Sequence, residues 1–223
     1  SSHVTYFSRR GAERFLFIAT IVIAILFAAS ALMPLVLAVG MGALVASELV
    51  LRFIGFGDPP LYVFDDEIEY YLAPDRTYKR FGETIRVNRH GMRSDDVDFS
   101  RIERQFVFSI YGDSIVYGQR LDQADTPPAQ LQRMLRSRTA GAASIVNGVS
   151  APSWGPENLL YFYNRFGPFP GNTAWIVQST HDMIDVTHQP HEIIPYRRTA
   201  PYGALHDFAF LAWSWARQWV LAR

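Results

Sequence analysis

The feature that most constrains this chain is a long uncharged stretch near its N-terminus. Residues 15–47, which are 33 consecutive positions between Arg14 and Glu48, include no Asp, Glu, Lys or Arg. An apolar run of about 18 residues or more is typical of a helix that crosses a membrane. The average composition of the 223 residues, with an apolar fraction of 49%, hides this segment. The sequence therefore predicts a membrane anchor over residues 1–57, with membrane lipid as its partner.

The uncharged run is longer than one crossing requires. At about 1.5 Å per residue it would form a helix of roughly 50 Å, whereas the hydrocarbon layer is about 30 Å thick. Because proline removes a backbone donor and clashes with the preceding turn, we expect a break at Pro34, with a span over residues 15–38 and an interfacial helix over 41–54. The alternative is two short spans that turn near Pro34, although residues 30–34 offer few polar groups to satisfy a bent backbone.

Basic residues before the run indicate its orientation. Arg9, Arg10 and Arg14 precede it, and such residues favour the cytoplasmic side. The sequence predicts a single-pass protein of the bacterial inner membrane whose remaining part lies in the periplasm. Two spans would reverse that side. A cleaved signal peptide is a further alternative, but this apolar run is much longer than a usual signal core.

Charge and cysteine content exclude several classes of protein. The chain has 21 basic and 21 acidic side chains, a balance that argues against non-specific binding of nucleic acid. It has no cysteine, which excludes disulfide frameworks, thiolate zinc sites and iron–sulfur clusters. No cofactor is expected.

The part after the anchor has two sections. Residues 58–104 form a charged lead-in, with a strand predicted over 84–88 and a turn over 89–91. Strands and helices then alternate: strand 105–111, a helix that Thr126 caps and that begins at Pro127, strand 144–147, helix 157–165 and a third, buried-type strand over 173–179. This alternation predicts a parallel sheet with crossover helices.

Each of the three predicted strands ends in a cluster of polar and small residues, at the edge where reactive groups collect in parallel sheets. After the first strand, Gly112 allows a tight turn from which Ser114 can project as a nucleophile. The alternative is an ordinary loop tripeptide in which Ser114 caps a helix.

On these residues the chain resembles the SGNH/GDSL hydrolase superfamily. The family's first block is Gly-Asp-Ser with a glycine four residues after the serine, which here is Gly118. Residues 147–158 (NGVSAPSWGPEN) resemble a second block, and residues 179–182 (STHD) stand where the family has Gly-X-Asn-Asp. Residues 88–94 and 125–131 also look like segments of membrane-anchored bacterial members. The resemblance implies a flavodoxin-like, three-layer α/β/α domain with a parallel sheet over residues 105–223, after an N-terminal transmembrane helix.

The resemblance also implies roles for individual residues. Ser114 matches the nucleophile, and its backbone N–H the first oxyanion donor. Ser150, or less favourably Gly148, matches the second backbone donor. His181 takes the place of the asparagine whose side chain is the third donor, which an imidazole N–H can replace in the right tautomer; alternatively His181 caps or packs at the strand end. The supporting residues are Gly112, Asp113, Gly118, Gly148 and Asp182, and Asp182 is expected to hold its loop by hydrogen bonds.

The family's catalytic base is a histidine in Asp-X-X-His near the end of the domain. The literal match here, Asp185 with His188, lies directly after the third block, a different place in the topology. We take these two residues as a tentative base pair, with a solvated loop as the alternative. A metal site is conceivable from ligand types, but nothing fixes a metal spacing, so none is predicted; these residues are His181, Asp182, Asp185, His188 and His191. The domain is therefore expected to be incomplete at its C-terminus.

A last helix is predicted over residues 204–222. Its apolar side carries Leu205, Phe208, Leu211, Trp215 and Trp219. Core packing is the default for such a stripe, whereas a membrane interface or a partner protein also suits the tryptophans.

Two functions follow as expectations. The first is a membrane-anchored serine esterase or acyltransferase acting on acyl esters, with the acetyl groups of cell-surface polysaccharide as the substrate class that the resemblance suggests. The second is a non-catalytic SGNH-fold subunit of a membrane protein complex, held through the span or the C-terminal aromatic helix. The second is motivated by the missing final block and by His181 in place of asparagine.

Overall fold

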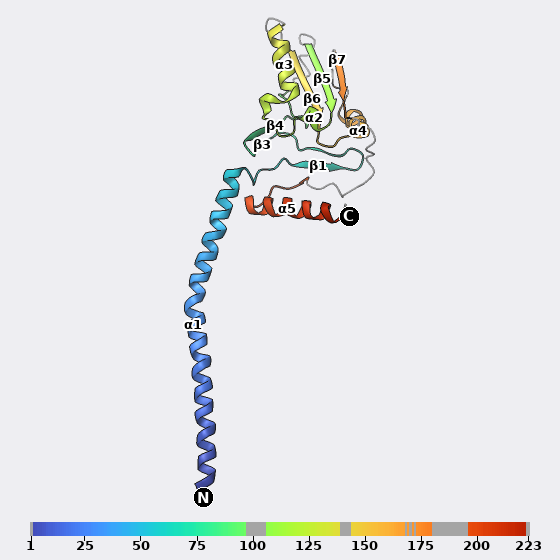
Figure 1. Ribbon diagram of the computed structural model, residues 1–223. Helices are drawn as coiled ribbons and strands as arrows, with labels where there is room; N and C mark the ends of the chain where they lie inside the picture. Colours follow the sequence, from blue (N-terminus) through green and yellow to red (C-terminus); the bar gives the residue numbers. More distant parts are fainter. Residues whose placement is uncertain are drawn as a thin grey trace. The chain divides into compact units, whose positions relative to one another are not determined.

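The computed structural model in Figure 1 describes residues 2–96, 106–138, 144–167, 169, 171, 173–179 and 196–221. The chain forms two compact units, Ser1–Leu49 and Val50–Arg223. The first unit is part of one long helix, and the second contains all the strands described here and has a mixed α/β fold.

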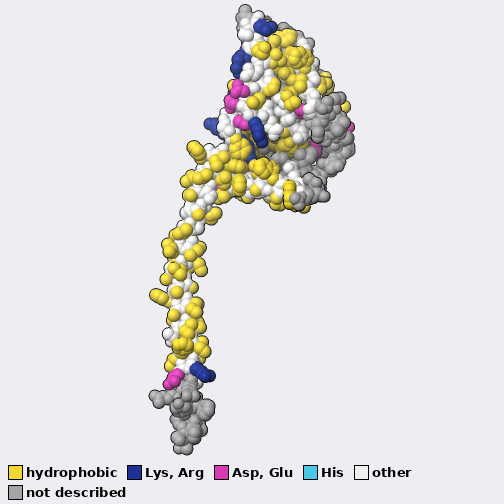
Figure 2. Space-filling view, viewed as in Figure 1, with side chains coloured by type: hydrophobic (Ala, Val, Ile, Leu, Met, Phe, Trp, Pro, Cys, Tyr) yellow, Lys and Arg dark blue, Asp and Glu magenta, His cyan; other side chains and the backbone are white. Residues whose placement is uncertain are grey.

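The long helix α1 runs from Ser2 to Ile54. The most apolar 18-residue window between Gly11 and Ile54 has a mean hydropathy of 2.8, so by length and composition this helix is long and apolar enough to cross a membrane. Figure 2 shows hydrophobic side chains along this helix. They are exposed within the protein, which is the pattern expected of a helix that is solvated by lipid rather than by a protein core.

The break predicted at Pro34 is wrong, and so is the two-span alternative, because α1 continues through this residue as one helix. Proline removes a single backbone donor, and membrane helices commonly bend at it without ending. Polar groups in the segment are satisfied within the helix: Ser30 Oγ donates to the Phe27 carbonyl and Ser47 Oγ to the Ala43 carbonyl, both at 2.8 Å.

The lead-in folds into two antiparallel hairpins. These are β1 (Tyr62–Asp65) with β2 (Glu69–Leu72), and β3 (Arg76–Arg80) with β4 (Glu83–Val87). Tyr70 and Leu72 alternate with half-buried neighbours in β2, as do Ile85 and Val87 with more exposed ones in β4, so each hairpin buries one face. The strand and turn predicted over 84–91 are confirmed, whereas the other three strands were missed.

The core of the second unit is a three-stranded parallel sheet in the order β6-β5-β7. Its strands are β5 (Phe106–Gly112), β6 (Ser144–Ser150) and β7 (Thr173–Val177), and the helices between them are α2 (Ser114–Tyr117), the short 3-10 helix η2 (Gln123–Asp125), α3 (Pro127–Arg138) and α4 (Pro156–Phe166). The predicted alternation of strands and helices is therefore confirmed, including the start at Pro127.

The two faces of the sheet pack against different helices. Phe108 and Ile110 of β5 join Val146 of β6 in a cluster that Leu131 and Leu135 of α3 cover. The residues that alternate with these along the strands point to the other face, where Tyr111 and Val149 pack with side chains of α4 and the hairpins. Successive side chains of a strand point to opposite faces of the sheet. The helices on the two faces therefore form three layers with the sheet in the middle.

Two expectations about burial are wrong. The strand predicted as buried, β7, pairs with β5 but leaves Trp175 and Ile176 exposed by 54% and 75%. The last helix, α5 (Ala204–Leu221), does not bury its aromatic side chains in the core: Phe208, Trp215 and Trp219 are exposed by 47%, 64% and 58%. Apolar sequence indicates what a side chain prefers, but the neighbouring elements decide whether it is covered.

Candidate active site

The carboxyl ends of the three parallel strands lie level with one another. Gly112, the last residue of β5, is in register with Ser150 of β6 and with Val177 of β7. Neighbouring strands are about 4.8 Å apart, so the loops that follow these three residues begin side by side. The structure thus brings the first two sequence clusters together at one edge of the sheet.

Gly112 makes the turn into α2 sterically feasible. A Cβ atom at this position would overlap the Val116 side chain and the carbonyl oxygen of Val177. The overlap with a backbone oxygen of the neighbouring strand cannot be relieved by a rotamer change. The absence of a side chain here therefore lets the chain fold back against β7 and start a helix within two residues.

Ser114 is the first residue of α2 and is half-buried. This helix is a single turn, and Gly118 ends it with a φ of 70° while its N–H donates to the carbonyls of Ser114 and Ile115, both at 3.1 Å. The structure therefore places Ser114 on a short, well-fixed turn at the carboxyl edge, as the sequence predicted.

Asp113 ties two of the loops together. Its carboxylate is 1% exposed, and it accepts hydrogen bonds from the Ile115 N–H at 2.7 Å and from the Ser179 N–H at 3.4 Å. The first bond caps α2, and the second crosses to the loop after β7. Asp113 thus positions the turn that carries Ser114; its supporting role in a catalytic site stays a prediction.

Replacing Asp113 should loosen this turn. We expect Asp113→Ala to lower the free energy of unfolding by about 1–2 kcal/mol, the usual cost of losing a helix N-cap. Urea unfolding of the full-length protein in detergent would measure it. The control is Asp96→Ala, which removes an exposed carboxylate paired with Arg89 at 3.6 Å. Equal unfolding midpoints for the two variants would contradict a positioning role for Asp113.

Ser150 and Gly148 have different surroundings. Ser150 is at the edge and buried, and its hydroxyl has no hydrogen-bond partner among the described residues. Gly148 lies two residues earlier, opposite Ile110, and a Cβ there would come within 2.7 Å of Cγ of Pro128. Gly148 therefore allows α3 to pack closely on the sheet, and Ser150 is the better placed of the two candidate donors.

The remaining site predictions lie outside the described residues. His181, Asp182, Asp185, His188 and His191 all fall between residues 180 and 195. The expected third oxyanion donor, the tentative base pair and the metal alternative therefore stay predictions.

The role of Arg93 was not predicted from the sequence. Its guanidinium donates to the carbonyls of Tyr117 (3.0 Å), Gly118 (2.8 Å) and Leu121 (2.6 Å), so it binds the chain just after α2. It also donates to the Thr84 carbonyl of β4 at 3.3 Å. Arg93 is 1% exposed, and burial lowers the pKa of its guanidinium. The lead-in hairpin is thereby fastened to the loop that follows Ser114.

The segment around Arg93 is itself ordered by Asn88. Asn88 Oδ1 accepts from the N–H groups of His90 and Met92 at 2.9 and 3.0 Å, and Nδ2 donates to Ser94 Oγ at 3.2 Å. An asparagine that bonds to the backbone shortly after itself forms a turn of this kind. The turn was predictable from Asn88 and Gly91, whereas its connection to α2 was not.

The loop after β6 is fastened to the other hairpin. Trp154 Nε1 donates to the Tyr70 carbonyl at 2.8 Å, and the Tyr70 hydroxyl donates to the Pro152 carbonyl at 2.6 Å. Asn158 Nδ2 donates to the Ile68 carbonyl at 2.8 Å. The conspicuous Ser-Trp-Gly-Pro-Glu-Asn run of the second cluster therefore serves to lock this loop onto β1 and β2.

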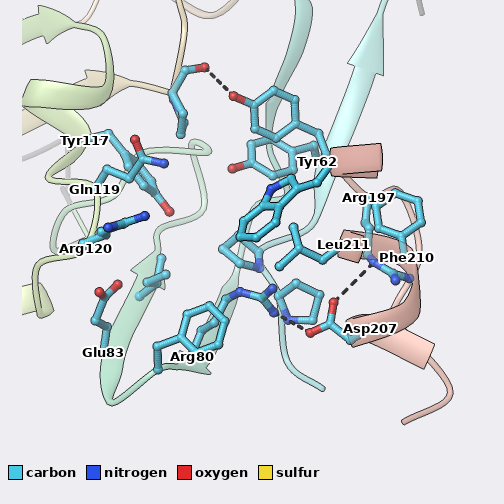
Figure 3. Close-up of a pocket in the computed structure, with 17 residues that line it drawn as sticks. Tyr62, Arg80, Glu83, Tyr117, Gln119, Arg120, Arg197, Asp207, Phe210 and Leu211 are labelled. Atoms are coloured by element: carbon cyan, nitrogen blue, oxygen red, sulfur yellow. Dashed lines mark hydrogen bonds and ion pairs between the residues drawn. The ribbon is translucent and has the colours of Figure 1, made fainter. Parts of the chain in front are cut away.

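A cavity of about 290 Å³ lies beside these loops (Figure 3). Tyr117 and Pro152 line it from the loops after β5 and β6, and Asp207 of α5 lies between two arginines at its other side. Arg80 Nη1 is 2.6 Å from Asp207 Oδ2, and Arg197 Nε is 3.5 Å from Oδ1. These residues are far apart in sequence, and no local pattern indicated that they meet.

Burial shifts the pKa values of five groups in the cavity wall: it lowers that of Arg197 and raises those of Tyr62, Tyr196, Tyr117 and Glu83. Burial raises the pKa of the Tyr117 phenol to about 12, although the nearby Arg93 opposes this, so the phenol is protonated at neutral pH. Burial also raises the pKa of the Glu83 carboxyl, against the influence of Arg93 and Arg120. The cavity wall thus combines the neutral phenol of Tyr117 with the carboxylate of Asp207, which is paired with Arg80 and Arg197.

Comparison with known proteins adds no assignment to this geometry. No family model matches the chain, and no curated protein matches it.

Proposed function

We propose that this chain is a membrane-anchored serine esterase or acyltransferase of the SGNH type, with acetyl esters of cell-surface polysaccharide as its first substrate class. The observation that carries the proposal is the position of Ser114. It follows Gly112 at the carboxyl edge of the β6-β5-β7 sheet, on a turn held by Asp113 and Arg93, with Ser150 beginning the adjacent loop.

The order of the strands supports the same site. β5 comes first in the chain and lies between the next two strands, β6 and β7. The crossover from β5 runs to β6 on one side, and the crossover from β6 runs to β7 on the other side of β5, so the chain reverses its direction across the sheet at β5. Ligands of open α/β sheets bind at the carboxyl edge where the direction reverses, and Ser114 follows β5 at this edge.

The proposed reaction is acyl transfer through a covalent intermediate. Ser114 Oγ attacks the acyl carbonyl carbon while a histidine base takes its proton, and the base then protonates the departing alcohol. Water or a second hydroxyl releases the acyl group from Ser114. The sequence candidates for the base and its orienting acid are His188 and Asp185.

The negative oxygen of the tetrahedral intermediate needs donors. We assign these to the backbone N–H groups of Ser114 and Ser150 and to the His181 side chain. One preorganised donor contributes about 2.7–4 kcal/mol to the lowering of such a barrier. His181 is included because it stands where SGNH hydrolases have the asparagine donor.

We further propose that the α/β unit lies in the periplasm and that α1 crosses the bacterial inner membrane once. The support is the length and hydropathy of α1 together with Arg9, Arg10 and Arg14 on its N-terminal side.

A second candidate is a non-catalytic subunit that keeps the fold and binds other membrane proteins. The observation that favours it is the exposed apolar surface of β7, where Trp175 and Ile176 are exposed by 54% and 75%. Large exposed apolar patches are typical of protein interaction sites.

Covalent labelling separates the two candidates. We expect a fluorophosphonate probe to label the full-length protein in native membranes, and Ser114→Ala to abolish labelling. Ser137→Ala, which removes an exposed serine of α3, should label like the wild type. An established serine esterase in the same sample serves as the positive control. If that esterase reacts while wild-type Ser114 does not, the enzymatic proposal is wrong and the second candidate is favoured.

A further inference from the structure

The helix α5 has an unusual distribution of polar and apolar side chains. Its buried side includes the polar residues Asp207 and Ser214, which are 1% and 0% exposed. Its exposed side is mainly apolar, and the large side chains there are Phe208, Trp213, Trp215, Trp219 and Val220, each between 47% and 64% exposed. The half-buried Arg217 lies at the edge of this side, with its guanidinium carbon 5.7 Å from the centre of the Trp213 ring. A helix that faced water on this side would show the opposite pattern.

The start of α5 is bound to the residues that directly follow α1. The Gly57 N–H donates to Asp207 Oδ2 at 3.0 Å, and the rings of Phe56 and Phe208 meet edge to face at 5.5 Å. Arg80 holds the same carboxylate at 2.6 Å. The last residue of α1 is Ile54, so the first turn of α5 is fixed two to three residues beyond the end of the apolar helix.

This connection keeps the start of α5 close to the end of α1. If α1 crosses the bilayer, its uncharged run ends at residue 47, and Phe56 and Gly57 follow that run within ten residues, on the side where the chain leaves the hydrocarbon. The beginning of α5 then lies on the same side of the membrane, near its surface. Figure 1 shows the hairpins between α5 and the three-stranded sheet, so the outer side of α5 faces away from the sheet.

We propose that α5 lies flat in the headgroup region of the membrane that α1 crosses, with Trp213, Trp215 and Trp219 inserted at the boundary with the acyl chains. Tryptophan favours this depth because its ring is apolar and its N–H can bond to headgroups and water. A mainly apolar, aromatic side suits a lipid surface, and the long side chain of Arg217 beside Trp213 lets its charged end stay among the headgroups. The inference rests on the proposed membrane anchor and is independent of catalysis at Ser114.

Tryptophan fluorescence offers a selective test. The chain has five tryptophans, three of them on α5 and none in α1. Of the other two, Trp154 is 1% exposed and Trp175 is in β7. We would place the full-length protein in nanodiscs of phosphatidylcholine and phosphatidylglycerol, with and without bromine on the upper part of the acyl chains. Bromine quenches only rings that it can approach closely.

We expect the brominated lipid to reduce the emission to about half, because tryptophans at the interface lie within reach of the upper acyl chains. The triple variant Trp213→Phe/Trp215→Phe/Trp219→Phe should lose this quenching, and Trp175→Phe should keep it. Equal emission in the two lipids would overturn the proposal. Quenching that disappears with Trp175→Phe would also overturn it. So would α5 rings that are shielded only when two copies of the protein share a disc, because a second copy would then cover them. Probe labelling of Ser114, measured on the same samples, reports separately on the proposed activity.

Discussion

Replacing Arg93 by methionine should lower the free energy of unfolding by about 3–5 kcal/mol, as expected when a buried, fully bonded charge is lost from a folded protein. Four backbone carbonyls now accept from this guanidinium, and its charged plane lies 4.8 Å from the centre of the Tyr117 ring. Methionine fills similar space but donates to none of these oxygens. Each buried acceptor left without a donor costs about 1–3 kcal/mol.

The measurement is urea unfolding of the full-length protein in detergent, followed by fluorescence of the buried Trp154. Arg89→Met is the matched control, because Arg89 is 59% exposed and 3.6 Å from Asp96. Such a surface pair contributes little, so the control should remain within about 0.5 kcal/mol of the wild type. Arg93→Lys should fall between the two, since an ammonium group keeps the charge but not the planar set of donors. If Arg93→Met unfolded at the same midpoint as Arg89→Met, the fastening role of Arg93 would be refuted.

Replacing Gly112 by alanine should lower the free energy of unfolding by about 3 kcal/mol, the upper part of the usual range for overpacking. The added methyl group would overlap both the Val116 side chain and the Val177 carbonyl oxygen. One of these neighbours can move and the other belongs to a paired strand. The turn that carries Ser114 would have to shift away from β7.

A double variant tests which overlap matters. Gly112→Ala/Val116→Ala removes the side-chain overlap but leaves the one with Val177, so we expect it to recover only part of the lost stability. Gly42→Ala serves as the control, because a Cβ at Gly42 meets nothing within 4 Å. Complete recovery in the double variant, measured by the same urea unfolding, would show that the backbone of β7 does not limit residue 112.

Much of the secondary structure could be predicted because it depends on neighbours in sequence. The apolar runs that became β5 and β6 and the proline start of α3 were visible as local patterns, and so was the uncharged segment of α1. The continuation of α1 through Pro34 could not be predicted, because the cost of one missing hydrogen bond has to be weighed against the stability of the whole helix around it.

In the candidate site, too, the local features were predicted from the sequence and the long-range contacts were not. Ser114 and its flanking glycines were found from spacing, since the turn needs particular residues at fixed positions. The groups that hold the turn were not found: Arg93 acts on Gly118 from 25 positions away, and Trp154 bonds to Tyr70 across 84. Nothing in a local pattern indicates which carbonyl a distant guanidinium or indole will reach.

By itself, the sequence determined where the strands of the parallel sheet and the helices between them form, which segment suits a membrane, and which serine follows a tight turn. Those properties come from local sterics and from hydrophobic periodicity. Only the tertiary structure decided which apolar faces are covered. It left Trp175 and the tryptophans of α5 exposed, and it brought Arg80 to Asp207 across 127 positions. Burial and pairing depend on which surfaces meet, and that is a property of the whole fold.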